Sequence, residues 1–71
     1  MGRTTLGATV LQLHTTKRRC VLLLEGQQGL TRTIDCVAHF GNDQRNWPAK
    51  GSRVFLIISD EEVIEANLSD G

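Results

Sequence analysis

The apolar residues of this chain recur mostly at every second position, which is the spacing of a β-strand with one buried face. Four segments are predicted to be strands: "TTLGATVLQLHT", "RRCVLLLEG", "LTRTIDCVAHF" and "SRVFLIIS", of which the second and the fourth are apolar on both faces. In the first segment, Leu6, Ala8 and Val10 share one face, and Leu11 and Leu13 then take the other. This change of phase predicts a bulge or a sharp bend near Val10 and Leu11, as small closed barrels require.

The third segment predicts one long strand from Leu30 to Phe40, joined to the second segment by the Gly-containing turn "EGQQG". Pairing of Cys20 with Cys36, and of Leu22 with Ile34, would place one apolar face on the core. A slip of one residue would set that face against polar residues, so we expect the first register. The opposite face of this hairpin is half apolar, and it predicts a partner or oligomer surface formed by Val21, Leu23 and Val37.

The last segment, "SDEEVIEANLSDG", fits two structures. As a strand, it places Ile64, Ala66 and Leu68 on one face after a tight turn. As a short helix, it begins with a capping box formed by Ser59 and Glu62. Both alternatives remain open at this point.

Four or five strands in 71 residues, with a bent first strand, predict a mainly β fold and a single small β-barrel domain over residues 1–71. The layout of "GATVLQLHTTKRRCVLLLEG" and "PAKGSRVFLIISDEEVIEANLS" resembles the OB-fold domains of the S1 and translation-initiation-factor-1 type. That resemblance implies a five-stranded OB-like barrel. An SH3-like barrel would give much the same pattern.

The net charge is zero, but it is divided unevenly along the chain. Residues 1–53 hold all eight Lys and Arg against Glu25, Asp35 and Asp43, which leaves +5. Residues 54–71 hold five acids and no base, which is −5. Such a division predicts either a nucleic-acid face beside an acidic edge or two parts that neutralise each other in the fold.

The basic residues gather at two places where a ligand could be held. One is the tip of the first hairpin, and the other is the long connection "GNDQRNWPAKG" with the start of the fourth strand. Cationic side chains can bind phosphates while an aromatic ring stacks a base. The candidate nucleic-acid-binding residues are Lys17, Arg18, Arg19, Arg32, Arg45, Trp47, Lys50 and Arg53.

Trp47 is the only Trp, and the chain has no Tyr. The ring can be a plug that covers an open end of the barrel, or a surface platform that stacks a base, with Phe40 or His39 as further stacking candidates. Pro48 restricts the backbone of Trp47 in either case.

Other chemistry has little support in the sequence. There is no HExxH motif, Walker A loop or dinucleotide fingerprint, and Ser52, His39 and Asp43 lack a nucleophile elbow. The Cys and His residues do not have the spacing of a zinc site. We therefore expect no enzymatic activity, no metal and no cofactor. A Cys20–Cys36 disulfide is conceivable in the expected register, but two inward thiols in a cytoplasmic protein usually stay reduced.

No apolar run approaches the roughly 20 residues of a membrane helix, and the N-terminal stretch lacks the apolar core of a secretory signal. We expect a cytoplasmic protein with no membrane partner. The leading functional hypothesis is a non-enzymatic module that binds RNA or single-stranded DNA. The alternative is a protein-interaction or regulatory module, either a homo-oligomer or a small inhibitor of a larger machine.

Overall fold

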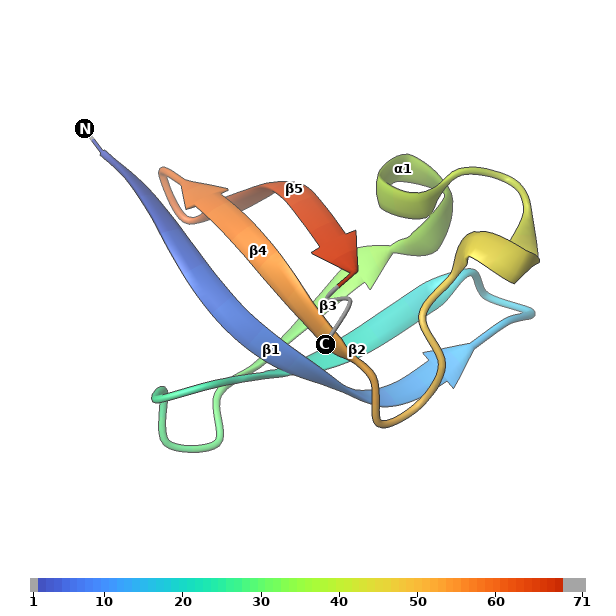
Figure 1. The fold of residues 1–71 in the computed structure, drawn as a ribbon, viewed down its shortest axis with the longest axis horizontal. Coiled ribbons are helices and arrows are strands. Elements are labelled where there is room, and N and C mark those ends of the chain that lie inside the picture. Colours follow the sequence, from blue (N-terminus) through green and yellow to red (C-terminus); the bar gives the residue numbers. More distant parts are fainter. Residues whose placement is uncertain (1, 69–71) are drawn as a thin grey trace.

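A computed structural model describes residues 2–68 and shows five strands that curl into a half-barrel (Figure 1). Neighbouring strands are all antiparallel, in the order β3-β2-β1-β4-β5. The elements are β1 (Arg3–His14), β2 (Arg19–Leu24), β3 (Thr31–Asp35), α1 (Cys36–Phe40), the 3-10 turn η1 (Gln44–Asn46), β4 (Arg53–Ser59) and β5 (Glu62–Leu68). The predicted fold class, mainly β with a small five-stranded barrel, is confirmed, and the arrangement is compatible with an OB-like layout.

The long strand β1 is shared between the two halves of the sheet. Its N-terminal half pairs with β4, from Arg3 to Thr9, and its C-terminal half pairs with β2, from Ala8 to His14. The β1–β2 register shifts between Val10 and Gln12, which confirms the predicted bulge. An extra residue at this point bends the strand and increases its twist, so that one strand can serve both sides of the curl.

The register of the β2–β3 hairpin differs from the expected one by two residues. Cys20 pairs with Ile34, and Leu22 pairs with Arg32. The expected pairing was wrong because the turn is tighter than assumed: the Leu24 N–H already donates to the carbonyl oxygen of Leu30, at 3.0 Å. A slip of two residues leaves each side chain on its original face, so the apolar pattern alone does not exclude it.

The expected long strand from Leu30 to Phe40 was also wrong, because β3 ends at Asp35 and the chain turns into α1. The Asp35 carboxylate caps this helix by accepting a hydrogen bond from the Val37 N–H at 2.9 Å. Asp at such a position stabilises the first turn of a helix and competes with continued strand pairing. Val37 therefore leaves the sheet and packs against the core from the helix.

The last segment is the strand β5, which settles the alternative between strand and helix. Asp60 and Glu61 form a two-residue turn, with φ angles of 53° and 68°. The β4–β5 register then shifts beside Ile57 and Ile58. The irregularity leaves Ile64 without a partner in the register, and Ile64 is exposed, as is Leu68 at the end of the strand, whereas Ala66 is buried.

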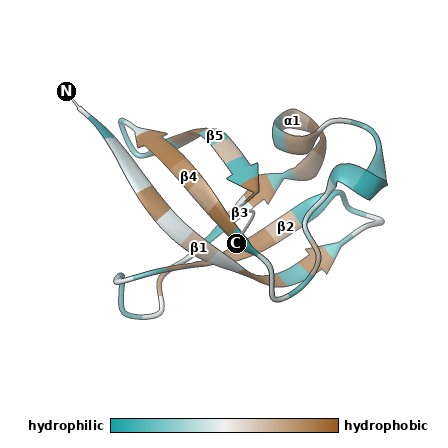
Figure 2. Ribbon diagram, viewed as in Figure 1, coloured by the Kyte–Doolittle hydropathy of each residue, from teal (hydrophilic) through white to brown (hydrophobic). Residues whose placement is uncertain are grey.

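The core fills the inside of the curl. Hydrophobic residues follow β4 and the inner positions of the other strands, whereas η1 and the turns are hydrophilic (Figure 2). No helix within residues 2–68 is long and apolar enough to cross a membrane. The buried side chains within residues 2–68 are Ala8, Val10, Cys20, Leu22, Leu24, Ile34, Cys36, Trp47, Pro48, Val54, Leu56 and Ala66.

Candidate nucleic-acid interface

The tip of the β1–β2 hairpin presents two cations on a tight turn. The Arg18 N–H donates to the Thr15 carbonyl oxygen at 3.2 Å, and Arg18 itself has a φ of 57°. Lys17 and Arg18 are exposed, as are the two Thr residues before them. Beside them is an open hollow lined by Leu13, His14, Thr15, Thr16 and Lys17. Hydroxyl and ammonium groups that face solvent together can bind a phosphate.

Three of the other candidate cations are paired with carboxylates. Arg53 lies 2.7 Å from Glu25, and Arg45 lies 2.9 Å from Asp43. Arg19 lies 3.9 Å from Asp35. These are the three acids of the basic part of the chain, so that part neutralises three of its own charges.

Two candidate cations are left without an ion pair beyond the hairpin tip. Lys50 is exposed in the loop before β4, and Arg32 donates instead to the backbone carbonyl oxygen of Glu61. No ion pair within residues 2–68 joins the basic part to the acidic part.

Asp43 and Arg45 act together within the long connection. The Asp43 carboxylate accepts from the backbone N–H of Arg45 at 3.0 Å and caps η1, while the Arg45 guanidinium donates to both carboxylate oxygens. These hydrogen bonds lower the pKa of Asp43 and raise the pKa of Arg45. The Arg45 guanidinium is thus already bound to a carboxylate of its own loop, and it is less available to bind a phosphate.

Trp47 is part of the core, with 7% of its surface exposed. Its indole Nε1–H donates to the Gly41 carbonyl oxygen at 2.7 Å, which satisfies the one polar atom of the ring. Of the two interpretations of Trp47, this arrangement fits the plug that covers an open end of the barrel. It leaves no open ring face on which a base could stack. Of the other stacking candidates, Phe40 packs against the core, and His39 is half-buried on α1.

The two thiols are buried and free, and no disulfide joins them. Burial, together with the neighbouring Cys36, raises the pKa of Cys20 to about 11. Burial also raises the pKa of Cys36. Thiols held in the neutral form are poor nucleophiles and poor metal ligands. No group of three or more potential metal-ligating side chains occurs in the described part of the chain.

Lys50 is held close to the middle of β1 by its loop. The Gly51 N–H donates to the Val10 carbonyl oxygen, and the Val10 N–H donates to the Ser52 carbonyl oxygen, both at 2.8 Å. The loop therefore continues the β1–β4 ladder as far as the bulge. Lys50 stands between the hairpin tip and the start of β4, where Arg53 lies.

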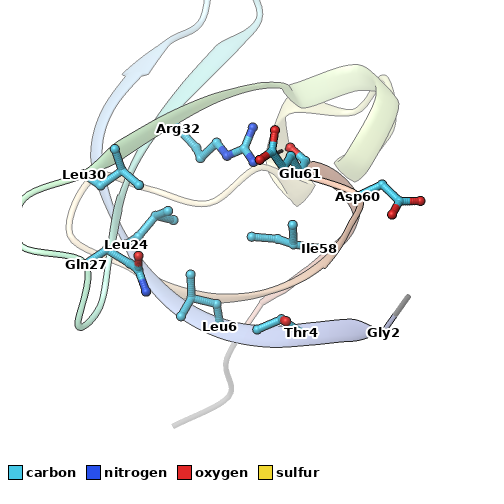
Figure 3. A pocket seen from close by; sticks show the side chains of 10 residues that line it. All are labelled: Gly2, Thr4, Leu6, Leu24, Gln27, Leu30, Arg32, Ile58, Asp60 and Glu61. Carbon is cyan, nitrogen blue, oxygen red and sulfur yellow. Dashed lines mark hydrogen bonds between the residues drawn. The ribbon is translucent and has the colours of Figure 1, made fainter.

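Arg32 lies at the mouth of the half-barrel, away from the hairpin tip. Its guanidinium reaches Glu61 across the gap between β3 and the β4–β5 turn, above a pocket of about 330 Å³ (Figure 3). The side chains of Leu6, Leu24, Leu30 and Ile58 point into this pocket. With Asp60 and Glu61 on its rim, the mouth is a poor place for a phosphate.

The expected partner surface is divided in the structure. Val21 and Leu23 lie half-buried on the outer face of β2, whereas Val37 packs against the core from α1. The three side chains do not share one strand face, because the helix begins directly after Asp35.

Phe55 is an exposed residue that sequence reasoning did not single out. It lies on β4 between Val54 and Leu56, and 40% of its surface is exposed. The Arg53 guanidinium carbon lies 5.8 Å from the centre of its ring, which is a cation–π distance. Because "VFLII" is apolar on both faces, only the strand parity set by Val54 and Leu56 could have marked Phe55 as outward-facing.

Comparisons with known proteins add no family to this description: no family model matches the chain, and no curated protein or solved structure matches it either.

Proposed function

We propose that this chain is a non-enzymatic module that binds single-stranded nucleic acid, RNA or DNA, through the β1–β2 hairpin tip. The observation that carries the proposal is the pair Lys17 and Arg18, exposed beside two Thr hydroxyls and without a carboxylate partner in residues 2–68. Lys50 extends this cationic surface along β1. Arg19, Arg45 and Arg53 have a secondary part, because each already holds a carboxylate.

The OB-like layout supports the β1–β2 hairpin tip as the binding site. OB-folds bind oligonucleotides across the second and third strands and at the loops that join strands one and two and strands four and five. In this chain the first of these loops is basic, and the second contains Asp60 and Glu61. We therefore carry over from the S1 and translation-initiation-factor-1 type only the binding at the β1–β2 loop. The acidic β4–β5 turn disfavours phosphates at the second loop.

The test is a fluorescence anisotropy titration of a labelled single-stranded oligonucleotide of about ten nucleotides at low salt. We expect the double variant Lys17→Gln, Arg18→Gln to bind at least tenfold more weakly than the wild type. The matched control is Arg3→Gln, Arg32→Gln, which removes the same charge at sites away from the tip. No binding by the wild type, or equal losses in both double variants, would reject the tip as the interface.

A second candidate function is a protein-interaction module. The strands β3 and β5 are both edges of the sheet, and the acids of the β4–β5 region form no ion pairs in the described residues. Unpaired edges can accept a strand from another chain, and acids attract a basic partner. Sedimentation at several protein concentrations tests self-association: a concentration-dependent dimer would favour this function, and a strict monomer would restrict it to a foreign partner.

A further inference from the structure

The outer face of the sheet where β1 meets β4 carries an exposed aromatic ring. Val54 and Leu56 are fully buried, so Phe55 between them points outward, with 40% of its surface exposed. Across the ladder it is opposite Gly7 of β1. Gly7 sets no side chain of its own against the ring, and the space above it is taken by the Glu25 carboxylate.

Because Gly7 has no side chain, the Glu25 carboxylate can lie close to the β1 backbone. A Cβ atom at Gly7 would collide with the Glu25 carboxylate, which lies over the strand at this point. The ion pair of Glu25 with Arg53 thus crosses β1 directly above the glycine. Beside Phe55 the surface therefore consists of the β1 backbone at Gly7 and the ion pair of Glu25 with Arg53.

Arg53 is only partly used by this ion pair. Its Nη2 contacts the Glu25 carboxylate at 2.7–2.8 Å, while no hydrogen bond from Nε or Nη1 is present in residues 2–68. The side chain is 54% exposed. A guanidinium has five donors, so Arg53 can bind a phosphate while it stays near the ring of Phe55.

We infer that Phe55 stacks a base of the bound strand, that Arg53 binds the adjoining phosphate, and that Glu25 weakens this binding by holding Arg53. The inference rests on the proposed function and extends its site from the hairpin tip to the start of β4. The occupant is a single-stranded nucleic acid, since Lys50, Lys17 and Arg18 continue the positive charge from Arg53 towards the tip. Base stacking on an aromatic ring beside cations is the usual mode of sequence-tolerant single-strand binding.

The distances along β1 suit such a strand. From Gly7 to Thr15 the chain advances eight residues, roughly 26 Å at the rise of a β-strand, less the effect of the bulge. Gly51, which follows Lys50 in the chain, donates to the Val10 carbonyl oxygen between these ends. A site of this length holds several nucleotides, within the range found for one OB-fold.

The experiment compares three variants in the same anisotropy titration. Phe55→Ala should bind roughly 5- to 100-fold more weakly, the range for loss of one stacked base. The matched control is Ile64→Ala, which truncates an equally exposed apolar residue, 40%, on β5 and should bind as the wild type does. Glu25→Gln should bind roughly two- to fivefold more tightly, because it removes a negative charge and frees Arg53.

A direct reading comes from Phe55→Trp. Its indole emission should be quenched on binding, whereas the buried Trp47 of the wild type should respond little. Phe55→Leu preserves apolar volume without an aromatic face, so it should be as weak as Phe55→Ala and replaces it if that variant unfolds. Circular dichroism verifies the fold of each variant.

The outcomes separate the two claims. If the wild type does not bind, the proposed function and this inference both fail. If the wild type binds and the hairpin-tip variant is weakened, while Phe55→Leu and Phe55→Ala match Ile64→Ala, the tip remains the interface and the stacking role of Phe55 is overturned.

Discussion

Glu25, Asp35 and Asp43 each neutralise an arginine of the same basic part of the chain. Two of these carboxylates also cap a helical turn: Asp35 begins α1, and Asp43 begins η1. Exposed ion pairs contribute little to stability, about 0–1 kcal/mol, so their main effect is on which cations remain free. For the proposed function, the unpaired cations therefore matter more than the total number of bases.

The thiol of Cys20 gives a stability change at alkaline pH. Its pKa is about 11 in the folded protein, raised by burial, against an ordinary value of 9.0. Because the folded state keeps its proton while the unfolded state loses it, the stabilisation is complete below pH 9 and is lost as the pH rises towards 11. The loss should be about 2–3 kcal/mol.

Urea unfolding at a series of pH values between 8 and 11 measures this change. The chain has no Tyr, so few other groups titrate in that window. Cys20→Ala is the control and should reduce the dependence to the part that comes from Cys36, whose pKa is also raised by burial. An equally steep fall of stability in Cys20→Ala would show that another group is responsible.

Trp47 is expected to serve stability and not binding. Trp47→Phe keeps a ring in the core but removes the hydrogen bond to Gly41, and we expect a loss of about 1–3 kcal/mol in the free energy of unfolding. The oligonucleotide affinity of the folded variant should stay within twofold of the wild type. A tenfold loss of affinity with little change in stability would instead assign the ring to the interface.

The β4–β5 turn carries local strain. Asp60 and Glu61 both have positive φ angles, which a two-residue turn of this kind requires and which Asn-Gly accommodates best. The double variant Asp60→Asn, Glu61→Gly should be more stable by about 0.5–1 kcal/mol. The hydrogen bond from Arg32 goes to the backbone of residue 61 and is kept.

Chemical denaturation tests this expectation through a higher urea midpoint at an unchanged slope. The opposite change is Glu61→Val, since a β-branched residue is strained at positive φ and should destabilise the protein. If both variants shift the midpoint in the same direction, the strain argument for this turn is wrong.

The strand-length elements were predictable from a period of two in the first and third segments and from short apolar runs in the second and fourth. The bulge in β1 was predicted because Leu11 and Leu13 change face, whereas the turn before β5 belonged to only one of the two alternatives that the last segment left open. The register of β2 with β3 was not predictable, since a two-residue slip preserves each face and only the turn geometry distinguishes the alternatives. The end of β3 was missed because Asp35 was taken as a strand residue rather than as a helix cap.

At the scale of the whole molecule, the division of charge survives folding. The basic part pairs internally, and within residues 2–68 the acids after residue 53 pair with no base. The sequence could indicate the basic hairpin tip, because a tip is exposed in any hairpin. It could not indicate that three arginines are already engaged, that Trp47 is buried or that Phe55 faces outward, since these depend on which strands become neighbours.

Because three arginines are already paired with carboxylates, we predict that oligonucleotide affinity depends only weakly on salt concentration. Each phosphate neutralised on a single strand contributes about −0.7 to the slope of log K against log salt concentration. With Lys17, Arg18, Lys50 and in part Arg53 available, we expect a slope of about −2 to −3. Anisotropy titrations between 20 and 200 mM salt measure it, and a slope near −5 would mean that the paired arginines also bind phosphates.

The shared strand β1 also has a consequence for the order of folding. Its pairing with β2 closes a short loop, as do the β2–β3 and β4–β5 hairpins, whereas its pairing with β4 joins distant parts of the sequence. Contacts between distant residues carry a larger loop-closure entropy and form more slowly. The bulge between Val10 and Gln12 therefore marks a kinetic boundary: the C-terminal half of β1 can pair early, and its N-terminal half waits for β4.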